Sequence, residues 1–475
     1  MKQLIILFII CVSITVKSQN PFNNLYGTAI DDDIISGISI VDSNIFLMTL
    51  SDYSLNTGPI ALFANHLGNA VNTYQEMSME GWNTRYFPYF NSTYVTTGGY
   101  YVYSESAQDV LIQIISDSTT IRIKHYGGSD IDYGRDLEIL PDSGFLIVGT
   151  TNSFGAGDYD VYIIRTDKNG DSLWTRTYGA VQDQFAYGVE KENDSVYVVA
   201  GSWGNQSSQS MDIFIMKINL EGDTISFKLN ATNILDEWCY SLCKTNDGGY
   251  MVAGSKTIPM STYYAFMFYM EKYDANLNKL WSKYYGDIYD NEAMDVKECY
   301  DHGFIMVGYS EQPNRGKDVY IVRTDSVGDT LWTRTLGGLY DDQAYSVVQT
   351  PDSGFAIVGN TYSYGAGGSD AFFLKLKPSG ETTVSFGLPV ENRNESFRFF
   401  PNPATNFITI EVQSNITKAT EIKIYNALGK LSLIETFEKG INIKSINLKS
   451  LSQGIYIIEL RDEYGIIGNR KLIKE

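Results

Sequence analysis

The sequence predicts an all-β fold in two parts, a long repetitive region and a shorter C-terminal region with a different pattern. Tyr and Gly are abundant, with 35 and 42 residues, as expected for many short strands joined by tight turns. An Asp-Ser-Gly or Asp-Gly-Gly turn followed by an apolar run recurs, for example at Asp142, Asp247 and Asp352. The repetitive region shows no helical periodicity.

Seven copies of this repeat align on the residue that follows the turn. The spacings between these anchor residues are 49 to 54 residues, and a period near 50 is typical of propeller blades. The anchors are Ile45, Tyr94, Phe145, Tyr197, Tyr250, Phe304 and Phe355.

Each copy contains four strand-like runs. In the third copy they are expected at Asp136–Leu140, Phe145–Thr150, Val161–Arg165 and Leu173–Tyr178. Seven units of four antiparallel strands predict a seven-bladed β-propeller, because a closed ring removes the long exposed edges of an open array.

The ring needs a strand that closes it. Residues Phe22–Gly27 resemble the outermost strand of a blade, as does the run Trp174–Gly179. Thr383–Gly387 is a second candidate for the same place. We favour pairing of the amino-terminal segment with the last blade, and an eighth, partial blade stays open as the alternative.

Residues Met1–Ser18 have the pattern of a secretory signal peptide. Lys2 gives the positive start, and the apolar stretch from Leu4 to Val16 is too short to span a membrane. Cys11 would suit a lipoprotein, but Ile10 stands where a small residue is needed. We expect no transmembrane segment in the mature chain.

The chain is acidic, with a formal net charge of -20 that becomes -22 when Lys2 and Lys17 leave with the signal peptide. This charge argues against nucleic acid and anionic membrane surfaces as partners. Three cysteines remain in the mature chain, Cys239, Cys243 and Cys299. Their odd number and their positions predict small buried residues without a disulfide bridge.

Eleven residues before the anchors, five of the seven copies have a small residue, as expected for the strand nearest the propeller axis. Fourteen residues before them, six of the seven copies have a carboxylate, in the loop that leads from one blade into the next. These acids predict a ring at one end of the central channel, a candidate site for cations or polyols, although a structural role is the alternative. They are Asp31, Glu80, Asp183, Asp236, Asp290 and Asp341.

Other polar positions are better explained by turns. Five aspartates that begin the third strand are expected to accept backbone N–H bonds. The segment Asp167–Asp171 resembles part of a calcium loop, but it lacks the distal Glu, so a hairpin turn and no metal are expected. Exposed aromatic residues such as Trp203, Tyr362 and Tyr364 are candidates for stacking on sugars.

From Lys377 the repeat ends, and Pro389–Ser396 reads as a linker. We therefore place the signal peptide at 1–18, the propeller at 19–387, the linker at 388–396 and a second domain at 397–475. In this domain strands are expected at Ile408–Val412, Ile422–Tyr425, Ile455–Leu460 and Lys471–Lys474. An immunoglobulin-like β-sandwich is the general interpretation.

The second domain also resembles a known family. Its marks are the Pro401-Asn402-Pro403 start, the turns at Gly429 and Gly454, Tyr456, and the basic ending that contains Lys471. In this order they resemble the C-terminal sorting domain of the type IX secretion system of Bacteroidetes-type bacteria. The resemblance implies a small β-sandwich recognised by the outer-membrane translocon, with export across both membranes to the cell surface or the medium.

The propeller region resembles the Asp-Gly-Gly repeats of secreted bacterial proteins, which implies a fold and not an activity. Only three His are present, and no nucleophile or phosphate-binding motif occurs. We expect a non-catalytic binding or interaction protein without a cofactor, whose surface ligand is a glycan or a protein. The alternatives are a carbohydrate-active hydrolase that uses carboxylates of the propeller, and a structural or adhesive surface protein.

Overall fold

A computed structural model of the chain divides into two compact units, one that ends at Val384 and one that begins at Ser385. The structure describes residues 24–26, 33–42, 45–52, 60–65, 70–75, 81–88, 93–102, 107–116, 119–231, 235–260, 264–286, 289–312, 316–365, 368–382, 397–400, 403–412, 420–426, 431–437, 443–462 and 465–474.

The first unit contains seven four-stranded antiparallel sheets, which we number in chain order. Sheet 1 consists of β2 (Asp33–Asp42), β3 (Ile45–Asp52), β4 (Ile60–Asn65) and β5 (Ala70–Gln75). Sheet 2 consists of β6 (Gly81–Pro88), β7 (Thr93–Val102), β8 (Ala107–Ser116) and β9 (Thr119–Tyr126). Sheet 3 consists of β10 (Asp132–Ile139), β11 (Phe145–Thr151), β12 (Asp160–Thr166) and β13 (Ser172–Tyr178).

The remaining sheets follow the same order. Sheet 4 consists of β14 (Gln184–Asn193), β15 (Val196–Gly204), β16 (Met211–Asn219) and β17 (Thr224–Leu229). Sheet 5 consists of β18 (Glu237–Lys244), β19 (Tyr250–Pro259), β20 (Tyr264–Tyr273) and β21 (Lys279–Tyr285). Sheet 6 consists of β22 (Asn291–Glu298), β23 (Phe304–Gln312), β24 (Gly316–Thr324) and β25 (Thr330–Leu336). Sheet 7 consists of β26 (Asp342–Gln349), β27 (Phe355–Thr361), β28 (Asp370–Leu376) and β1 (Asn24–Tyr26).

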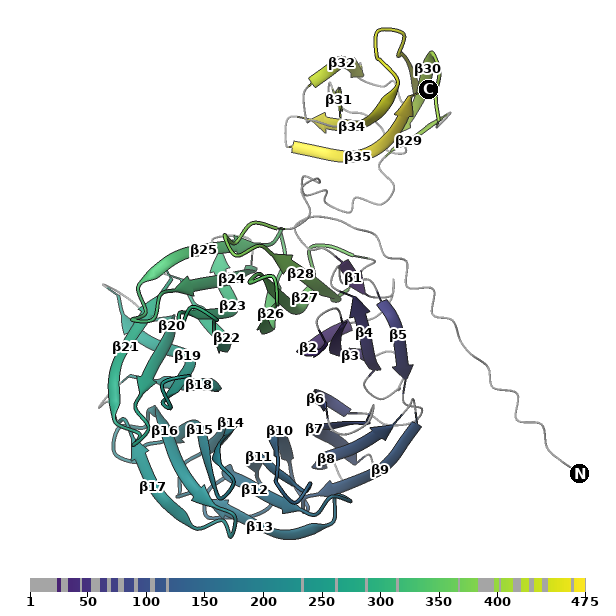
Figure 1. Cartoon of the computed structure of the whole chain (residues 1–475). Coiled ribbons are helices and arrows are strands. Elements are labelled where there is room, and N and C mark those ends of the chain that lie inside the picture. The colour runs from purple at the N-terminus through teal and green to yellow at the C-terminus, as the bar shows by residue number, and fades with distance from the viewer. Residues whose placement is uncertain are drawn as a thin grey trace, which may run out of the picture. The chain divides into compact units, whose positions relative to one another are not determined.

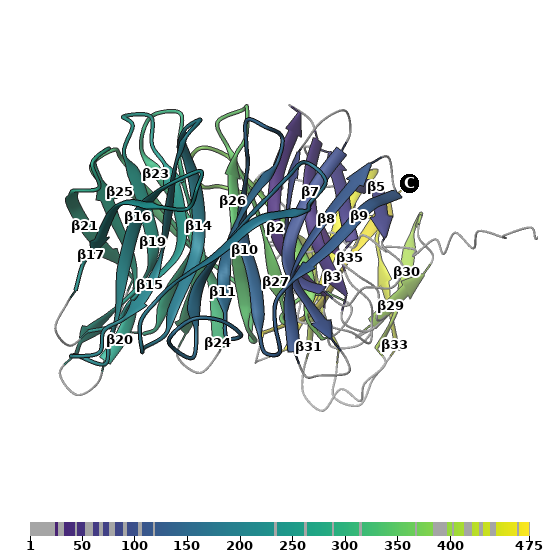
Figure 2. The ribbon, with the colours of Figure 1, turned by 90° about the horizontal axis from the view of Figure 1, so that it is seen from below.

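The seven sheets stand around a common axis, with the first strand of each nearest the centre, as in a β-propeller (Figure 1). We call the four positions the inner, second, third and outer strand. Seen from the side, the strands connect at two opposite ends of the ring (Figure 2). We call the end with the Asp-Ser-Gly turns the turn end, and the end where one sheet leads into the next the loop end.

The amino-terminal strand closes the ring. β1 pairs antiparallel with β28, with Leu25 opposite Phe372, and so occupies the outer position of sheet 7. Sheets 1 and 7 also share a core in which Ile35 and Met48 pack with Val358 and Phe373. The expected pairing of the amino-terminal segment is therefore confirmed, whereas Thr383–Gly387 lies outside the described residues.

The core lies between neighbouring sheets. Apolar side chains of sheet 3, such as Val148, meet those of sheet 4, such as Tyr197 and Phe214, and all are fully buried. Burying one such side chain contributes about 1.5–3 kcal/mol. The expected small residues of the inner strands, among them Ala293 and Ala344, are also fully buried. Cys239, Cys243 and Cys299 are buried and unpaired, as expected.

The Asp-Ser-Gly turn explains why the repeat keeps its first and last residues. In sheet 7, the Asp352 carboxylate accepts the Gly354 N–H at 3.0 Å and pairs with the Lys375 ammonium of the third strand at 2.9 Å. A Cβ at Gly354 would lie 2.3 Å from the Leu376 carbonyl oxygen, so the turn needs glycine there. Sheets 5 and 6 repeat the ion pair as Asp247–Lys272 and Asp301–Arg323.

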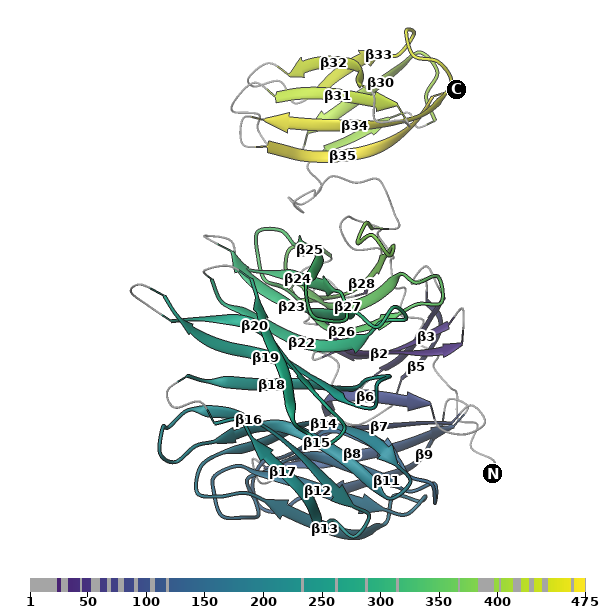
Figure 3. The same ribbon diagram turned by 60° about the vertical axis from the view of Figure 1, so that its left-hand side comes forward.

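The second unit has two sheets, visible as two layers in Figure 3. One is formed by β29 (Phe397–Phe400), β30 (Phe407–Val412) and β33 (Ile443–Asn447). The other is formed by β31 (Thr420–Asn426), β32 (Leu431–Phe437), β34 (Gly454–Asp462) and β35 (Gly465–Lys474). Both enclose one core, in which Ile408 and Ile410 meet Ile424, Ile458 and Leu472. The four expected strands are present; β29, β32 and β33 were not expected.

Candidate functional site

Four of the predicted ring acids lie at the loop end as half-buried side chains. Each accepts a backbone N–H from the start of the third strand of the preceding sheet. Asp236 accepts it from Met211 at 2.9 Å and Asp290 from Phe266 at 2.8 Å. Asp341 accepts it from Lys317 at 2.9 Å and Asp183 from Tyr159 at 3.3 Å.

The same residues also bind their own sheet through the backbone. The carbonyl oxygen of Asp290 accepts the Glu311 N–H at 2.7 Å, and that of Asp341 accepts the Tyr362 N–H at 2.8 Å. Each aspartate therefore connects two neighbouring sheets, which supplies a structural reason for its recurrence. Asp31 and Glu80 lie outside the described residues. A ligand-binding role for the ring stays a prediction.

Asp160, which begins the third strand of sheet 3, is a turn acid, as expected, whereas Asp212 of sheet 4 receives the Asn205 side-chain amide at 3.1 Å. The Asp160 carboxylate accepts the Ala156 and Gly157 N–H groups at 2.8 and 3.0 Å. Asp167 likewise accepts the Asn169 and Asp171 N–H groups at 2.7 and 2.9 Å, which makes its segment a hairpin turn.

A buried polar position next to the ring escaped the sequence analysis. The residue that begins the inner strand is polar and fully buried in each of sheets 3 to 7. Burial raises the pKa of Asp132 and Asp342, and burial together with Glu271 raises that of Glu237. A polar residue thirteen positions before the anchor in each of these five sheets was the available signal. The five are Asp132, Gln184, Glu237, Asn291 and Asp342.

The acids at the turn end have the opposite electrostatics. Partial burial acts to raise the pKa of Asp352, but hydrogen bonds from Thr350 and Lys375 outweigh it and bring the pKa to about 2. The pKa of Asp247 falls to about 2 for the same reasons, through Thr245 and Lys272. These carboxylates therefore stay charged in the folded protein.

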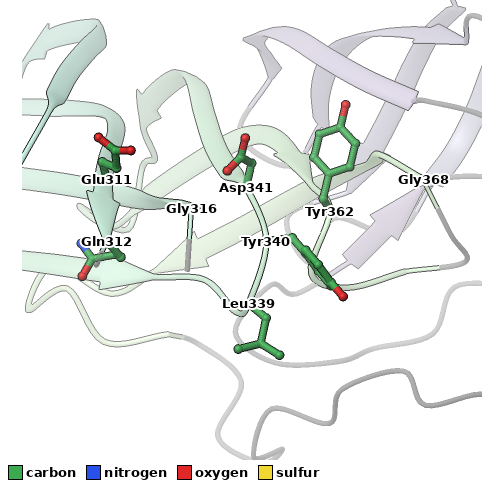
Figure 4. A pocket seen from close by; sticks show the side chains of 8 residues that line it. All are labelled: Glu311, Gln312, Gly316, Leu339, Tyr340, Asp341, Tyr362 and Gly368. Atoms are coloured by element: carbon green, nitrogen blue, oxygen red, sulfur yellow. The ribbon is translucent and has the colours of Figure 1, made fainter. Parts of the chain in front are cut away.

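A hollow of about 750 Å³ opens at the loop end between sheets 6 and 7. Four segments line it: the end of β23 with Glu311 and Gln312, the start of β24 at Gly316, the connection with Tyr340 and Asp341, and the loop that begins at Tyr362. In Figure 4 the side chains of Glu311, Asp341 and Tyr362 point to one side of these segments, and those of Gln312 and Tyr340 to the other.

The two tyrosines of the hollow are exposed, Tyr340 by 63% and Tyr362 by 41%. Ser363 holds their segments together, because its hydroxyl oxygen accepts the Tyr340 N–H and its hydroxyl donates to the Tyr340 carbonyl, both at 3.0 Å. Tyr362 thus has the exposure that stacking on a sugar needs. Tyr364 and Trp203 do not: Tyr364 is buried, and Trp203 packs against Phe214 and Phe227.

The described residues contain no group of three or more His, Cys, Asp or Glu side chains placed to hold a metal ion. Within the same residues, no helix is long and apolar enough to cross a membrane. His302 lies in the turn of sheet 6, where its Nδ1 is 3.2 Å from Glu298, and His66 lies outside the described part.

In the second unit, four of the residues that suggested a sorting domain lie in the described part of the structure. Tyr456 is buried, and its hydroxyl donates to the Ser452 carbonyl at 2.9 Å. Gly454 begins β34, Lys471 lies in β35 opposite Ile457, and Pro403 is exposed. Pro401, Asn402 and Gly429 lie outside the described residues.

Residues 398–475 match the family described as secretion system C-terminal sorting domain. This segment is a type IX secretion sorting domain. A sorting domain of this kind implies interaction with that secretion system, and export to the cell surface or the medium. The resemblance noted in the sequence is thereby confirmed.

Solved structures with a similar arrangement of strands show low sequence identity. A protein of unknown function from Dyadobacter fermentans is 12% identical, with 63% of this chain and 95% of that chain covered and a TM-score of 0.41. The β-propeller domain of the Trilobed protease from Pyrococcus furiosus is 13% identical, with 73% and 92% covered and a TM-score of 0.37.

The uncomplexed acylaminoacyl peptidase from Pyrococcus horikoshii is 12% identical, with 82% of this chain and 59% of that chain covered and a TM-score of 0.43. Similarity at this level carries no inference about activity. A comparison with curated protein sequences found no match.

Proposed function

We propose that the chain is exported by the type IX secretion system and acts outside the cell as a non-catalytic binding protein. In this proposal residues 1–18 are the signal peptide, 19–387 a seven-bladed propeller, 388–396 a linker, and 397–475 an immunoglobulin-like sorting domain. The seven four-stranded sheets, with β1 closing the last, support the blade count. The two layers around one core support the sandwich.

The observation that carries the binding role is the hollow between sheets 6 and 7. Tyr362 exposes aromatic surface there on the side to which the carboxylates of Glu311 and Asp341 point, and Tyr340 exposes aromatic surface on the other side (Figure 4). Aromatic rings stack on the apolar faces of sugars, and carboxylates accept hydrogen bonds from hydroxyl groups. We therefore propose a glycan as the ligand, with Asp341 as the member of the acidic ring that contributes to the site.

The test is glycan binding by the exported form of the chain, which begins at Gln19. Binding of an oligosaccharide that weakens at least about tenfold in both Tyr340→Ala and Tyr362→Ala, a loss of about 1.4 kcal/mol each, would support the proposal. Tyr300→Ala is the matched control, because Tyr300 is equally exposed but lies at the turn end. Equal binding by all three variants would contradict it.

The hydrolase alternative has one observation in its favour, because Glu311 and Asp341 line the same hollow. Asp341 already accepts the Lys317 N–H, which gives its carboxylate a structural use. Incubation with the bound oligosaccharide separates the two functions. New reducing ends that disappear in Glu311→Gln would favour hydrolysis, whereas an intact oligosaccharide would favour binding. Lack of any glycan binding would favour the structural or adhesive alternative.

A further inference from the structure

We infer that the propeller has a second binding site, for small aromatic monocarboxylates, around Arg135 on the axis of the ring. The site starts from an irregularity that the inner strands share. Near the start of the inner strand in sheets 1, 3, 4, 5, 6 and 7, one residue has no partner on the second strand, which makes a β-bulge. These bulge residues are Ser36, Arg135, Tyr187, Tyr240, Met294 and Tyr345.

The bulge residues face the axis of the ring. The inner strands stand nearest the axis (Figure 1), and a bulge turns the extra side chain away from the regular faces of its sheet. All six bulge residues are partly exposed, although both chain neighbours of each are buried. Since neighbouring sheets cover the strands around them, this exposure is toward the axis. A small ligand that enters along the axis can therefore reach these side chains.

Three of the bulge residues form a continuous wall across sheets 3, 4 and 5. The guanidinium carbon of Arg135 lies 5.3 Å from the centre of the Tyr187 ring. Tyr187 meets Tyr240 edge to face, with ring centres 5.4 Å apart. Trp238 continues the wall, because its ring is nearly parallel to that of Tyr240 at 6.3 Å. This wall presents aromatic surface beside one guanidinium group.

Arg135 differs from the other arginines because it has no anionic partner. Its guanidinium lies over the Tyr133 and Tyr187 rings, and it forms no hydrogen bond or ion pair with the described residues. Only its Nε is fully buried, so Nη1 and Nη2 can be reached from the axis. Every other arginine with a described side chain in the propeller donates to a protein oxygen. These are Arg122, Arg165, Arg176, Arg323 and Arg334.

The acids nearest to this wall are engaged elsewhere. Asp136, next to Arg135 in the chain, accepts the Val189 N–H at 3.1 Å and so faces sheet 4. Glu292, on the inner strand of sheet 6, accepts the hydroxyl of Tyr240. A carboxylate supplied by a ligand can accept two parallel N–H bonds from a guanidinium, and such charge-assisted pairs are strong. A ligand carboxylate is therefore the partner that suits Arg135.

The surroundings of Arg135 also limit the size and shape of the anion. Arg135 is the one cation among the described bulge residues, and the formal net charge of -20 repels polyanions. The rings that flank the guanidinium already exclude part of its water, which lowers the desolvation cost of binding a single carboxylate. Tyr187 and Tyr240 offer ring edges and faces that favour an aromatic ring on the ligand. A small aromatic monocarboxylate meets all of these conditions.

The experiment uses 3-phenylpropionate as the probe and compares it with its neutral amide and with acetate. Calorimetric titration of the chain that begins at Gln19 measures the three affinities. We expect 3-phenylpropionate to bind at least about tenfold more tightly than either, because the amide lacks the charge and acetate lacks the ring. Arg135→Gln should remove the advantage over the amide, and Arg135→Lys should remove less of it. Tyr187→Leu should reduce the advantage over acetate and keep that over the amide.

The matched control is Arg176→Gln. Arg176 belongs to the same sheet, but it lies exposed on the outer strand and pairs with Asp223, so its replacement should leave binding unchanged. Because Arg135 has no hydrogen bond or ion pair to lose among the described residues, Arg135→Gln should keep the stability of wild type, which denaturant unfolding checks.

Three results would overturn the inference: no binding of 3-phenylpropionate, equal binding of the acid and the amide, or an equal loss in Arg135→Gln and Arg176→Gln. The inference does not rest on glycan binding, because the hollow is lined by residues of sheets 6 and 7. Oligosaccharide binding that is unchanged in Arg135→Gln would show that the two sites are separate, so that either proposal can fail while the other stands.

Discussion

At the turn end of sheet 7, Asp352 is exposed and pairs with the buried ammonium of Lys375. At the loop end of the same sheet, Asp342 is fully buried and receives neutral donors from Thr361, Ser363 and Gly338. The first arrangement lowers the pKa of the aspartate to about 2, and the second raises it. One residue type therefore has opposite protonation preferences at the two ends of one sheet.

The two ends of the sheets also differ in how strictly their polar contacts repeat. The turn end repeats the same closed ion pair in sheets 5, 6 and 7, which leaves little for a ligand to do. The loop end has buried polar groups whose partners differ from sheet to sheet, as Asn291 and Asp342 show. Variation in an otherwise regular repeat makes the loop end the better place for function.

The largest expected effect comes from glycine substitutions at the two ends. A Cβ at Gly303, at the turn end, would lie 2.2 Å from the Thr324 carbonyl oxygen, a backbone atom that cannot rotate away. A Cβ at Gly337, at the loop end, would lie 2.1 Å from Asp318 Oδ1 and 2.8 Å from Asp342 Oδ2, which are side-chain atoms. We expect Gly303→Ala to cost about 3 kcal/mol and Gly337→Ala about 1–2 kcal/mol.

Denaturant unfolding of the two variants measures this difference. Comparable losses for both would show that the loop end is as rigid as the turn end.

A smaller effect is expected when the turn-end ion pair is broken. Asp301 binds the Arg323 guanidinium through both oxygens, at 2.5 and 2.6 Å, and Arg323 is almost fully buried. Asp301→Ala leaves that guanidinium without its carboxylate, but Asp301 itself is 62% exposed and water can replace part of the interaction. We expect a loss of about 1.5–3 kcal/mol in the free energy of unfolding.

The double variant Asp301→Ala/Arg323→Met serves as the control for this pair. It should recover part of the loss, because no buried charge remains unpaired. A double variant that is less stable by the sum of both single losses would contradict a direct pairing.

The smallest expected effect concerns the loop-end acids that connect neighbouring sheets. Asp290→Ala removes one hydrogen bond to the Phe266 N–H, which lies at the half-buried start of a third strand. We expect a loss of about 1 kcal/mol. Asp290→Asn keeps the acceptor and should lose less. A loss above that of Asp301→Ala would mean that the ring acids have a larger structural role than their single contact indicates.

Much of the fold could be predicted from the sequence, because the turns and strands of each repeat depend on residues that are close together in the chain. The glycines that end the Asp-Ser-Gly turns and the period near 50 specify four strands per unit, and Leu25 and Tyr26 resemble an outer strand closely enough to predict the closure. In the second unit, β32 and β33 were not expected, since their exposed residues, such as Leu431 and Ile443, obscure the alternation of the strands.

The candidate site was harder to predict, since it depends on residues that do not repeat. Leu339 and Tyr340 reach the hollow from the connection between two sheets, and Glu311 reaches it from the end of β23. No spacing in the sequence shows that these segments meet.

The pH dependence of stability tests the contrast between the two ends most directly. The lowered pKa of Asp352 gives stability that is present above about pH 4, near the pKa of an unfolded aspartate, and is lost as the pH falls toward about 2. The raised pKa of Asp342 gives stability that is present below about pH 4 and is lost as the pH rises through the folded pKa.

The measurement is the unfolding of wild type, Asp352→Asn and Asp342→Asn from about pH 2 to pH 7, where the two carboxyls titrate. As the pH rises, Asp352→Asn should become less stable relative to wild type, between about pH 2 and pH 4. Asp342→Asn should become more stable relative to wild type, from about pH 4 upward. Relative stabilities that change in the same direction for both variants would contradict the assignment of opposite roles to the two ends.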